Sequence, residues 1–198
     1  AVTENAATDL GASTVSGTLG ITSAGAVTDS GTLAVTGATT ISASGQDISL
    51  DQAASTFGTL ALTGANVAVT ENAATDLGAS TVSGTFAITS GGAITDSGTQ
   101  AITGDATFTN TAGTDDAITL DDASNAFGGT VTFATDSGSA VTIVDTTALD
   151  LKALTAASLS ATSGGAVTDS GTLAIAGATT ISASGQDITL DQAASTFG

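Results

Sequence analysis

Internal repetition is the feature that most limits how this chain can fold. Residues 1–18 recur without change at 68–85, and residues 38–58 recur at 178–198 with a single difference, Ser49 against Thr189. Between these copies the same frame continues in a more diverged form. Repetition on this scale is typical of folds in which similar segments stack on one another. The chain divides into three units, 1–58 (incomplete), 59–128 and 129–198.

Short runs inside each unit alternate apolar and polar residues, as in Leu33–Thr36, Ile48–Asp51 and Leu60–Thr63. This period of two, together with abundant Thr and Val, predicts half-buried β-strands. Clusters such as Asp29-Ser30-Gly31 predict the turns between them. The segment 146–157 comes nearest to a helical pattern, but it aligns with strand-like residues of the other units. We therefore expect an all-β protein.

Each unit divides further into segments of about twenty residues, which is the length of one coil of a three-sided β-helix. After a partial segment at 1–17, the expected rungs are 18–37, 38–58, 59–84, 85–104, 105–128, 129–157, 158–177 and 178–198. The sequence thus predicts a parallel β-solenoid with about 20–29 residues per rung and uncapped ends. A tandem of Ig-like sandwiches is the alternative, although units of about seventy residues without Trp are short for that fold.

Composition excludes several classes of function. The chain has 1 Lys+Arg against 19 Asp+Glu, a net charge of -18, and neither His nor Cys. A nucleic-acid-binding protein needs a basic face, which this chain lacks. Zinc sites of the usual kind, thiol nucleophiles and imidazole bases need His or Cys. No apolar run approaches the ~18 residues of a membrane span, so we expect no membrane insertion within this segment.

Three motifs carry a resemblance to a known group of proteins. GAVTDSGTLAVTG, ATTISASGQDISLD and ALTGANVAVTEN resemble the β-strand repeats of bacterial surface proteins, and they are similar to filamentous haemagglutinin-like adhesins and autotransporter passengers. The resemblance covers the whole chain and is one of composition and period. It implies a right-handed parallel β-helix, export, and a role as a stalk or fibre at the cell surface. It carries over no functional residue.

The acidic residues are the candidate metal ligands. Asp29, Asp51 and Glu71 are expected near the same corner of successive rungs, where a divalent cation would relieve the repulsion between stacked carboxylates. The densest acidic patch consists of Asp115, Asp116, Asp121 and Asp122 with Asn125. These oxygen ligands suit calcium. A solvated acidic face is the alternative, because the calcium-roll nonapeptide and the EF-hand spacing are both missing.

Other residues have simpler interpretations. Phe57, Phe127 and Phe197 recur before Gly once per unit, and we expect them to fill the core. Lys152, the only basic residue, is expected in a longer loop of the rung at 129–157. We expect no enzyme: the acids recur with the repeat, and there is no Trp, Tyr or Arg to hold a sugar. The Thr-rich faces could be interpreted as an ice-binding array, but we interpret them as ordinary Thr residues on the surface of strands.

The sequence favours a structural, non-catalytic segment of an exported bacterial surface or extracellular filament protein. The alternative is an adhesin module that recognises a cell-surface or matrix glycan, with its site at a break in the repeat, in 105–128 or 129–157. Gly198 is equivalent to Gly58, so both ends of the sequence lie inside a repeat. We therefore expect the partner to be the protein itself, by continuation of a longer chain or by end-to-end stacking of copies.

Overall fold

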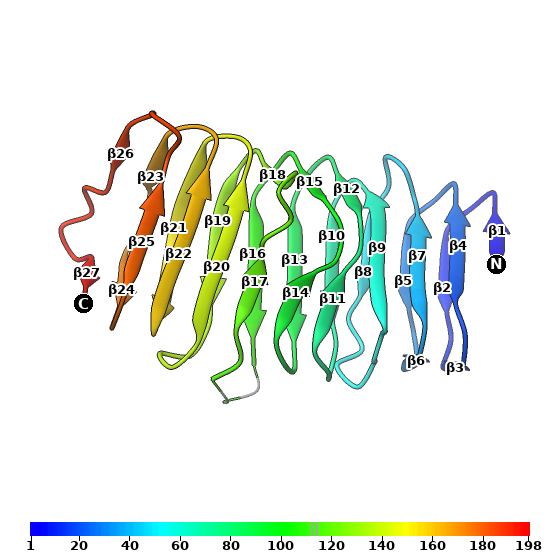
Figure 1. Cartoon of the computed structure of the whole chain (residues 1–198). Helices are drawn as coiled ribbons and strands as arrows, with labels where there is room; N and C mark the ends of the chain where they lie inside the picture. Colours follow the sequence, from blue (N-terminus) through cyan, green and yellow to red (C-terminus); the bar gives the residue numbers. More distant parts are fainter. Residues whose placement is uncertain (112, 114) are drawn as a thin grey trace.

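The computed structural model describes residues 1–111, 113 and 115–198. Its regular structure is entirely β, and every pairing between the described strands is parallel. The strands stack into an elongated rod of about ten turns (Figure 1). This confirms the predicted β-solenoid. It also excludes tandem Ig-like sandwiches, whose sheets are antiparallel. Among the described residues no helix is long and apolar enough to cross a membrane.

Two long rows of strands form the opposite sides of the rod. Sheet A contains the row β1 (Val2–Glu4), β4 (Leu19–Ser23), β7 (Ala38–Ser42), β9 (Thr59–Gly64), β11 (Thr75–Leu77), β14 (Ile94–Asp96), β17 (Ile118–Leu120), β20 (Ala140–Asp145), β22 (Ser158–Ser163) and β25 (Thr179–Ser182). Sheet B contains the row β2 (Thr8–Leu10), β5 (Val27–Asp29), β8 (Ile48–Leu50), β10 (Val67–Thr70), β13 (Phe86–Ser90), β16 (Ala106–Asn110), β19 (Thr130–Ala134), β21 (Leu149–Ala156), β23 (Val167–Asp169) and β26 (Ile188–Thr189).

Short third strands complete most turns. They are β3 (Ser13–Val15), β6 (Leu33–Val35), β12 (Ser80–Val82), β15 (Gln100–Ile102), β18 (Ala126–Phe127), β24 (Leu173–Ile175) and β27 (Thr196–Phe197). In a typical turn, one longer strand on one side of the rod faces two short strands on the other, as β4 faces β5 and β6. The turn is therefore a flattened coil, and its third side is short.

The repeat is not a whole number of turns long. In sheet A, the three steps from β4 to β7, β9 and β11 are three turns of the rod. The strand equivalent to β4 in the second unit is β13. It lies half a turn beyond β11, in sheet B. The extra half-turn arises because β9 is followed directly by another longer strand, β10, with no pair of short strands between them. The strand pair β19 and β20 repeats this step and returns the longer strands to sheet A.

Figure 1 shows the same alternation in the third strands. They lie along the lower side of the rod at β3 and β6, along the upper side at β12, β15 and β18, and along the lower side again at β24 and β27. The predicted rungs at 59–84 and 129–157 were therefore wrong in one respect. Each contains one and a half turns and is not a single long rung.

Lys152 is also placed differently from the prediction. It lies within strand β21 and not in a loop. Val131 pairs with Leu151 and Thr132 pairs with Ala153, so Lys152 is an extra residue in a bulge. A bulge leaves one residue without a cross-strand partner, which allows the exposed Lys152 side chain to interrupt the regular alternation.

The core is a thin column of alternate side chains from both sheets. In the middle of the rod it is aromatic: Phe108 is fully buried, with ring centroids 5.9 Å from Phe86, 6.0 Å from Phe127 and 5.8 Å from Phe133. Phe127 and Phe57 are buried and fill the core as expected, but the prediction was wrong for Phe197, which is 44 % exposed because no further turn covers the last strand, β27. Packing in the middle of the rod therefore depends on a cluster of large rings.

We predict that Phe108→Ala lowers the free energy of unfolding by about 3–5 kcal/mol, because it removes a ring that contacts three others and leaves a cavity. The matched control is Phe197→Ala, since Phe197 is 44 % exposed on β27 and should cost about 1 kcal/mol or less. Urea unfolding followed by circular dichroism measures both. Equal losses for the two variants would contradict the proposed importance of the ring cluster.

Candidate functional site

One aspartate makes the same contact in each unit. It ends a short strand in the motif Thr-Asp-Ser-Gly, as Asp29 on β5, Asp96 on β14 and Asp169 on β23. The Asp51 backbone N–H donates to Asp29 Oδ1 (2.8 Å), the Asp121 N–H to Asp96 Oδ1 (2.9 Å), and the Asp191 N–H to Asp169 Oδ1 (2.8 Å). Each carboxylate thus holds the next turn where that turn leaves its strand.

Burial shifts the pKa of two of these aspartates. Desolvation raises the pKa of Asp29 and of Asp96, although hydrogen bonds to the carboxylates act in the opposite direction. Asp29 is 6 % exposed, and its Oδ2 has no hydrogen-bond partner. Asp96 is better satisfied, because its Oδ2 also accepts hydrogen bonds from the Asp122 N–H (3.3 Å) and the Asn125 side-chain amide.

Glu71 is an internal group. It is 2 % exposed, and both of its carboxylate oxygens accept hydrogen bonds. The Phe57 N–H donates to Oε2 (3.1 Å), and the Thr75 hydroxyl donates to Oε1 (2.6 Å). Desolvation raises the pKa of Glu71 to about 7. Glu71 is therefore occupied by contacts within the protein, and it offers no free oxygen to a cation from solvent.

The predicted calcium ligands do not converge. Asp29, Asp51 and Glu71 lie at the same corner of successive turns, as expected, but Asp29 and Glu71 are buried whereas Asp51 is exposed. In the second patch, Asp115 and Asp121 are exposed, and Asp116 and Asp122 are half-buried. Across residues 1–111, 113 and 115–198, no three acids are grouped closely enough to hold a metal ion. Calcium binding therefore remains a prediction for the exposed acids.

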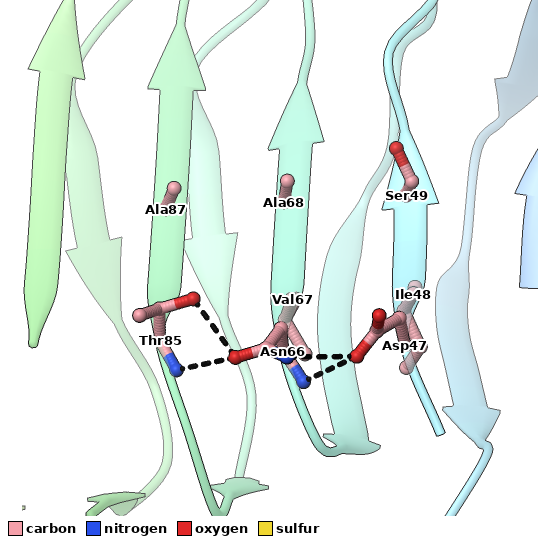
Figure 2. A pocket seen from close by; sticks show the side chains of 8 residues that line it. All are labelled: Asp47, Ile48, Ser49, Asn66, Val67, Ala68, Thr85 and Ala87. Atoms are coloured by element: carbon pink, nitrogen blue, oxygen red, sulfur yellow. Dashed lines mark hydrogen bonds between the residues drawn. The ribbon is translucent and has the colours of Figure 1, made fainter. Parts of the chain in front are cut away.

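Sequence reasoning missed a polar row on the surface of sheet B. Figure 2 shows Asp47, Asn66 and Thr85 at the start of three neighbouring strands. The Asn66 N–H and side-chain amide donate to Asp47 Oδ1 (3.1 and 2.9 Å), and the Thr85 N–H and hydroxyl donate to Asn66 Oδ1 (3.0 and 3.1 Å). Beside this row, the small side chains Ser49, Ala68 and Ala87 line a shallow groove of about 200 Å³.

The comparisons with known proteins identify the repeat. A family described as "Repeats of unknown function (DUF5649)" matches residues 1–63, 64–134 and 138–198. The chain belongs to this DUF5649 repeat family. Neither the curated proteins nor the solved structures gave a match. The three DUF5649 segments together cover almost the whole chain, with bounds that differ from those of the units 1–58, 59–128 and 129–198.

Equivalent contacts recur from one DUF5649 repeat to the next. The Ser55 hydroxyl oxygen accepts from the Leu33 N–H (3.0 Å), and Ser195 accepts from the Leu173 N–H (3.1 Å). In the middle repeat, Asn125 takes the same role and accepts from the Gln100 N–H (2.7 Å). Together with the aspartates, these side chains form internal supports between turns. Their recurrence indicates that these contacts have a structural role in every repeat.

We predict that Asp96→Ala destabilises the protein by about 1–3 kcal/mol, because it leaves the Asp122 N–H and the Asn125 amide without their acceptor. Asp121→Ala is the matched control, since the Asp121 side chain is exposed and its loss should cost no more than about 0.5 kcal/mol. Thermal unfolding at constant pH measures both changes. Equal losses of stability in the two variants would show that the hydrogen bonds accepted by Asp96 do not stabilise the corner.

The calcium prediction has its own test. Calcium bound to the exposed acids of the folded chain should raise the unfolding temperature by mass action. Because sodium chloride also screens repulsion among the carboxylates, the comparison is between millimolar calcium chloride and sodium chloride at the same ionic strength. We expect the larger increase in calcium. Identical shifts in the two salts would reduce the effect to screening.

Proposed function

We propose that this chain is a structural, non-catalytic segment that acts as a rigid stalk or fibre in an exported bacterial surface or extracellular filament protein. The observation that carries the proposal is the continuity of the two rows of stacked parallel strands along the described chain. Parallel pairing gives every internal turn two neighbours, so a load along the rod is shared by many backbone hydrogen bonds. A rod built in this way should be stiff, and stiffness is what a stalk or fibre requires.

The close contact between turns supports the same function. Gly98 follows the repeated Asp-Ser motif, and a Cβ atom at this position would collide with the backbone of Ala79 in the preceding turn. Gly31 has the same relation to Ala12. Glycine is needed here because the neighbouring backbone leaves no room for a side chain. The corners of adjacent turns are thus packed against each other, which limits bending at these points.

Surface chemistry supports a location outside the cell. The net charge of -18 on 198 residues favours solubility and discourages side-to-side association. The absence of Cys is compatible with an oxidising environment. The resemblance of the sequence motifs to bacterial surface repeats points in the same direction. An antibody raised against the chain should label intact cells of the organism that produces it; labelling only after the cells are broken would refute export.

We propose that the partner of this chain is the same protein. Among the described residues, the large hydrophobic side chains that are exposed are Val2, Ile188 and Phe197. They lie on β1, β26 and β27, which are the first and last strands of the stack. Side chains at these positions inside the rod are covered by the next turn. We therefore propose that further turns, from the same chain or from another copy, cover them.

A second candidate function is recognition of a glycan, and the groove beside Asp47 and Asn66 favours it. The groove combines small side chains with a row of carboxylate, amide and hydroxyl groups, which suits a ligand rich in hydroxyls. Asn66→Ala should weaken binding to any glycan captured by the wild-type chain in a glycan screen. Unchanged binding in Asn66→Ala would separate glycan recognition from this groove.

We predict that the native rod resists trypsin. The chain has no Arg, and its only Lys, Lys152, lies within strand β21 between β19 and β23. A protease needs an extended, unpaired segment, so cleavage requires local unfolding. The folded chain should remain intact over hours, whereas in urea it should yield the fragments 1–152 and 153–198. Rapid cleavage of the folded chain would contradict a rigid rod.

A further inference from the structure

The two half-turn steps between repeats have a feature that the rest of the rod lacks. Each step contains an additional longer strand, β10 in the first and β20 in the second. Glu71 follows the end of β10, and Asp145 is the last residue of β20. We call the two steps the seams and these two residues the seam acids. They are the most deeply buried carboxylates among the described residues, at 2 % and 1 % exposure.

The seam acids make equivalent contacts although the sequence around them differs. The Phe57 N–H donates to Glu71 Oε2 (3.1 Å), and the Phe127 N–H donates to Asp145 Oδ1 (3.2 Å). Phe57 and Phe127 occupy the same position in their repeats, just before the chain enters β9 or β19. Each seam acid thus joins the last turn of one repeat to the first turn of the next.

Local hydroxyl groups complete the two sites. The Thr75 hydroxyl donates to Glu71 Oε1 (2.6 Å). The Thr147 N–H and hydroxyl both donate to Asp145 Oδ1 (2.9 Å each), whereas Asp145 Oδ2 is buried without a hydrogen-bond partner. Among the described residues, the donors to the two carboxylates are backbone N–H and hydroxyl groups, and none is a basic side chain. A buried carboxylate without a cationic partner is costly when ionised, so both sites favour the protonated acid.

Charged neighbours do not alter this balance. The ionisable groups on elements adjacent to the seam acids are Asp51 after β8, Asp76 on β11, Asp121 and Asp122 after β17, Asp136 before β20, and Asp150 and Lys152 on β21. The causes of both pKa shifts are, first, desolvation, which raises the pKa, and then hydrogen bonds, which lower it. The pKa of Glu71 reaches about 7, and that of Asp145 is raised.

We propose that the seams are proton-dependent joints: the repeats are locked together while Glu71 and Asp145 are protonated, and the seams open more readily once these acids ionise. The consequence for stability has a definite sign. Because folding raises the pKa of Glu71 from 4.5 to about 7, its contribution is fully present below 4.5 and is lost as the pH rises through 7. This inference concerns the rod itself and holds wherever the protein works.

The composition makes the proposal easy to test. The chain has no His and no Cys, the side chains whose ordinary pKa values, about 6.5 and 8.5, fall in the range from pH 5.5 to 8.5. Hydrogen–deuterium exchange should therefore be measured at these two pH values, with protection factors corrected for intrinsic exchange. If opening exposes Glu71 to solvent, the opening equilibrium at the first seam should rise about 30-fold over this range. The reference segment is 100–110, which includes β15 and β16 and contains no seam acid.

Two variants separate the seam acid from other carboxyls. Glu71→Gln keeps an acceptor for the Phe57 N–H but does not ionise, so it should abolish the pH dependence at the first seam. Asp76→Asn is the matched control on the next strand, and it should leave that dependence unchanged. Asp29 and Asp96, whose pKa values are also raised, remain in both variants.

Two results would overturn the proposal. One is a pH dependence at the first seam that persists in Glu71→Gln. The other is a wild-type chain in which the seam and the segment 100–110 lose protection equally, or in which neither loses any, between pH 5.5 and 8.5. The second result needs no variant, so the proposal stays testable even if Glu71→Gln fails to fold. At the second seam, Asp145→Asn removes the ionisable group in the same way, and the pH dependence of that seam should be lost in this variant.

Discussion

The rod depends on how backbone N–H groups are satisfied where the chain leaves a strand. Inside a strand, the neighbouring turn supplies each acceptor, but at a corner the backbone turns away and the N–H loses its partner. A buried N–H without an acceptor is strongly unfavourable. In this chain, short polar side chains from an adjacent turn take over that role, as Asp29 does for Asp51 and Ser55 does for Leu33. This is why carboxylates such as Asp29 and Asp169 are buried at the corners of an otherwise apolar rod.

The same requirement explains why acidic side chains recur along the rod although no three acids among the described residues are grouped closely enough to hold a metal ion. A carboxylate that accepts hydrogen bonds from the next turn is directed along the rod and not toward its neighbours around a cation. Asp96 illustrates this, because its oxygens accept from Asp121, Asp122 and Asn125 and bind them into one corner. Some of the residues that resemble a cluster of calcium ligands in the sequence, such as Asp121 and Asp122, instead donate backbone hydrogen bonds to a carboxylate of the preceding turn.

Much of the fold was accessible from the sequence because strand alternation and repeat length are local signals. The runs at Leu33–Thr36 and Ile48–Asp51 identified strands, and segments of about twenty residues identified the coil. The half-turn step was not found, because pairing between turns is non-local. The signal in the sequence that corresponds to the half-turn step is the unusual length of the segments 59–84 and 129–157. Burial of Glu71 was also missed: Glu71 continues the inward phase of Val67 and Val69, but its carboxylate indicated an exposed position.

The half-turn step also determines what such a rod presents to its surroundings. A side chain that faces one way in the first repeat faces the opposite way in the second and the original way in the third. A protein made of many such repeats would show the same chemical pattern on both flanks, with like-facing copies two repeats apart. Seven turns separate these copies, which corresponds to roughly 34 Å at about 4.8 Å per turn. A partner that binds one repeat would therefore find equivalent binding surfaces on both flanks of the rod, repeated at that spacing.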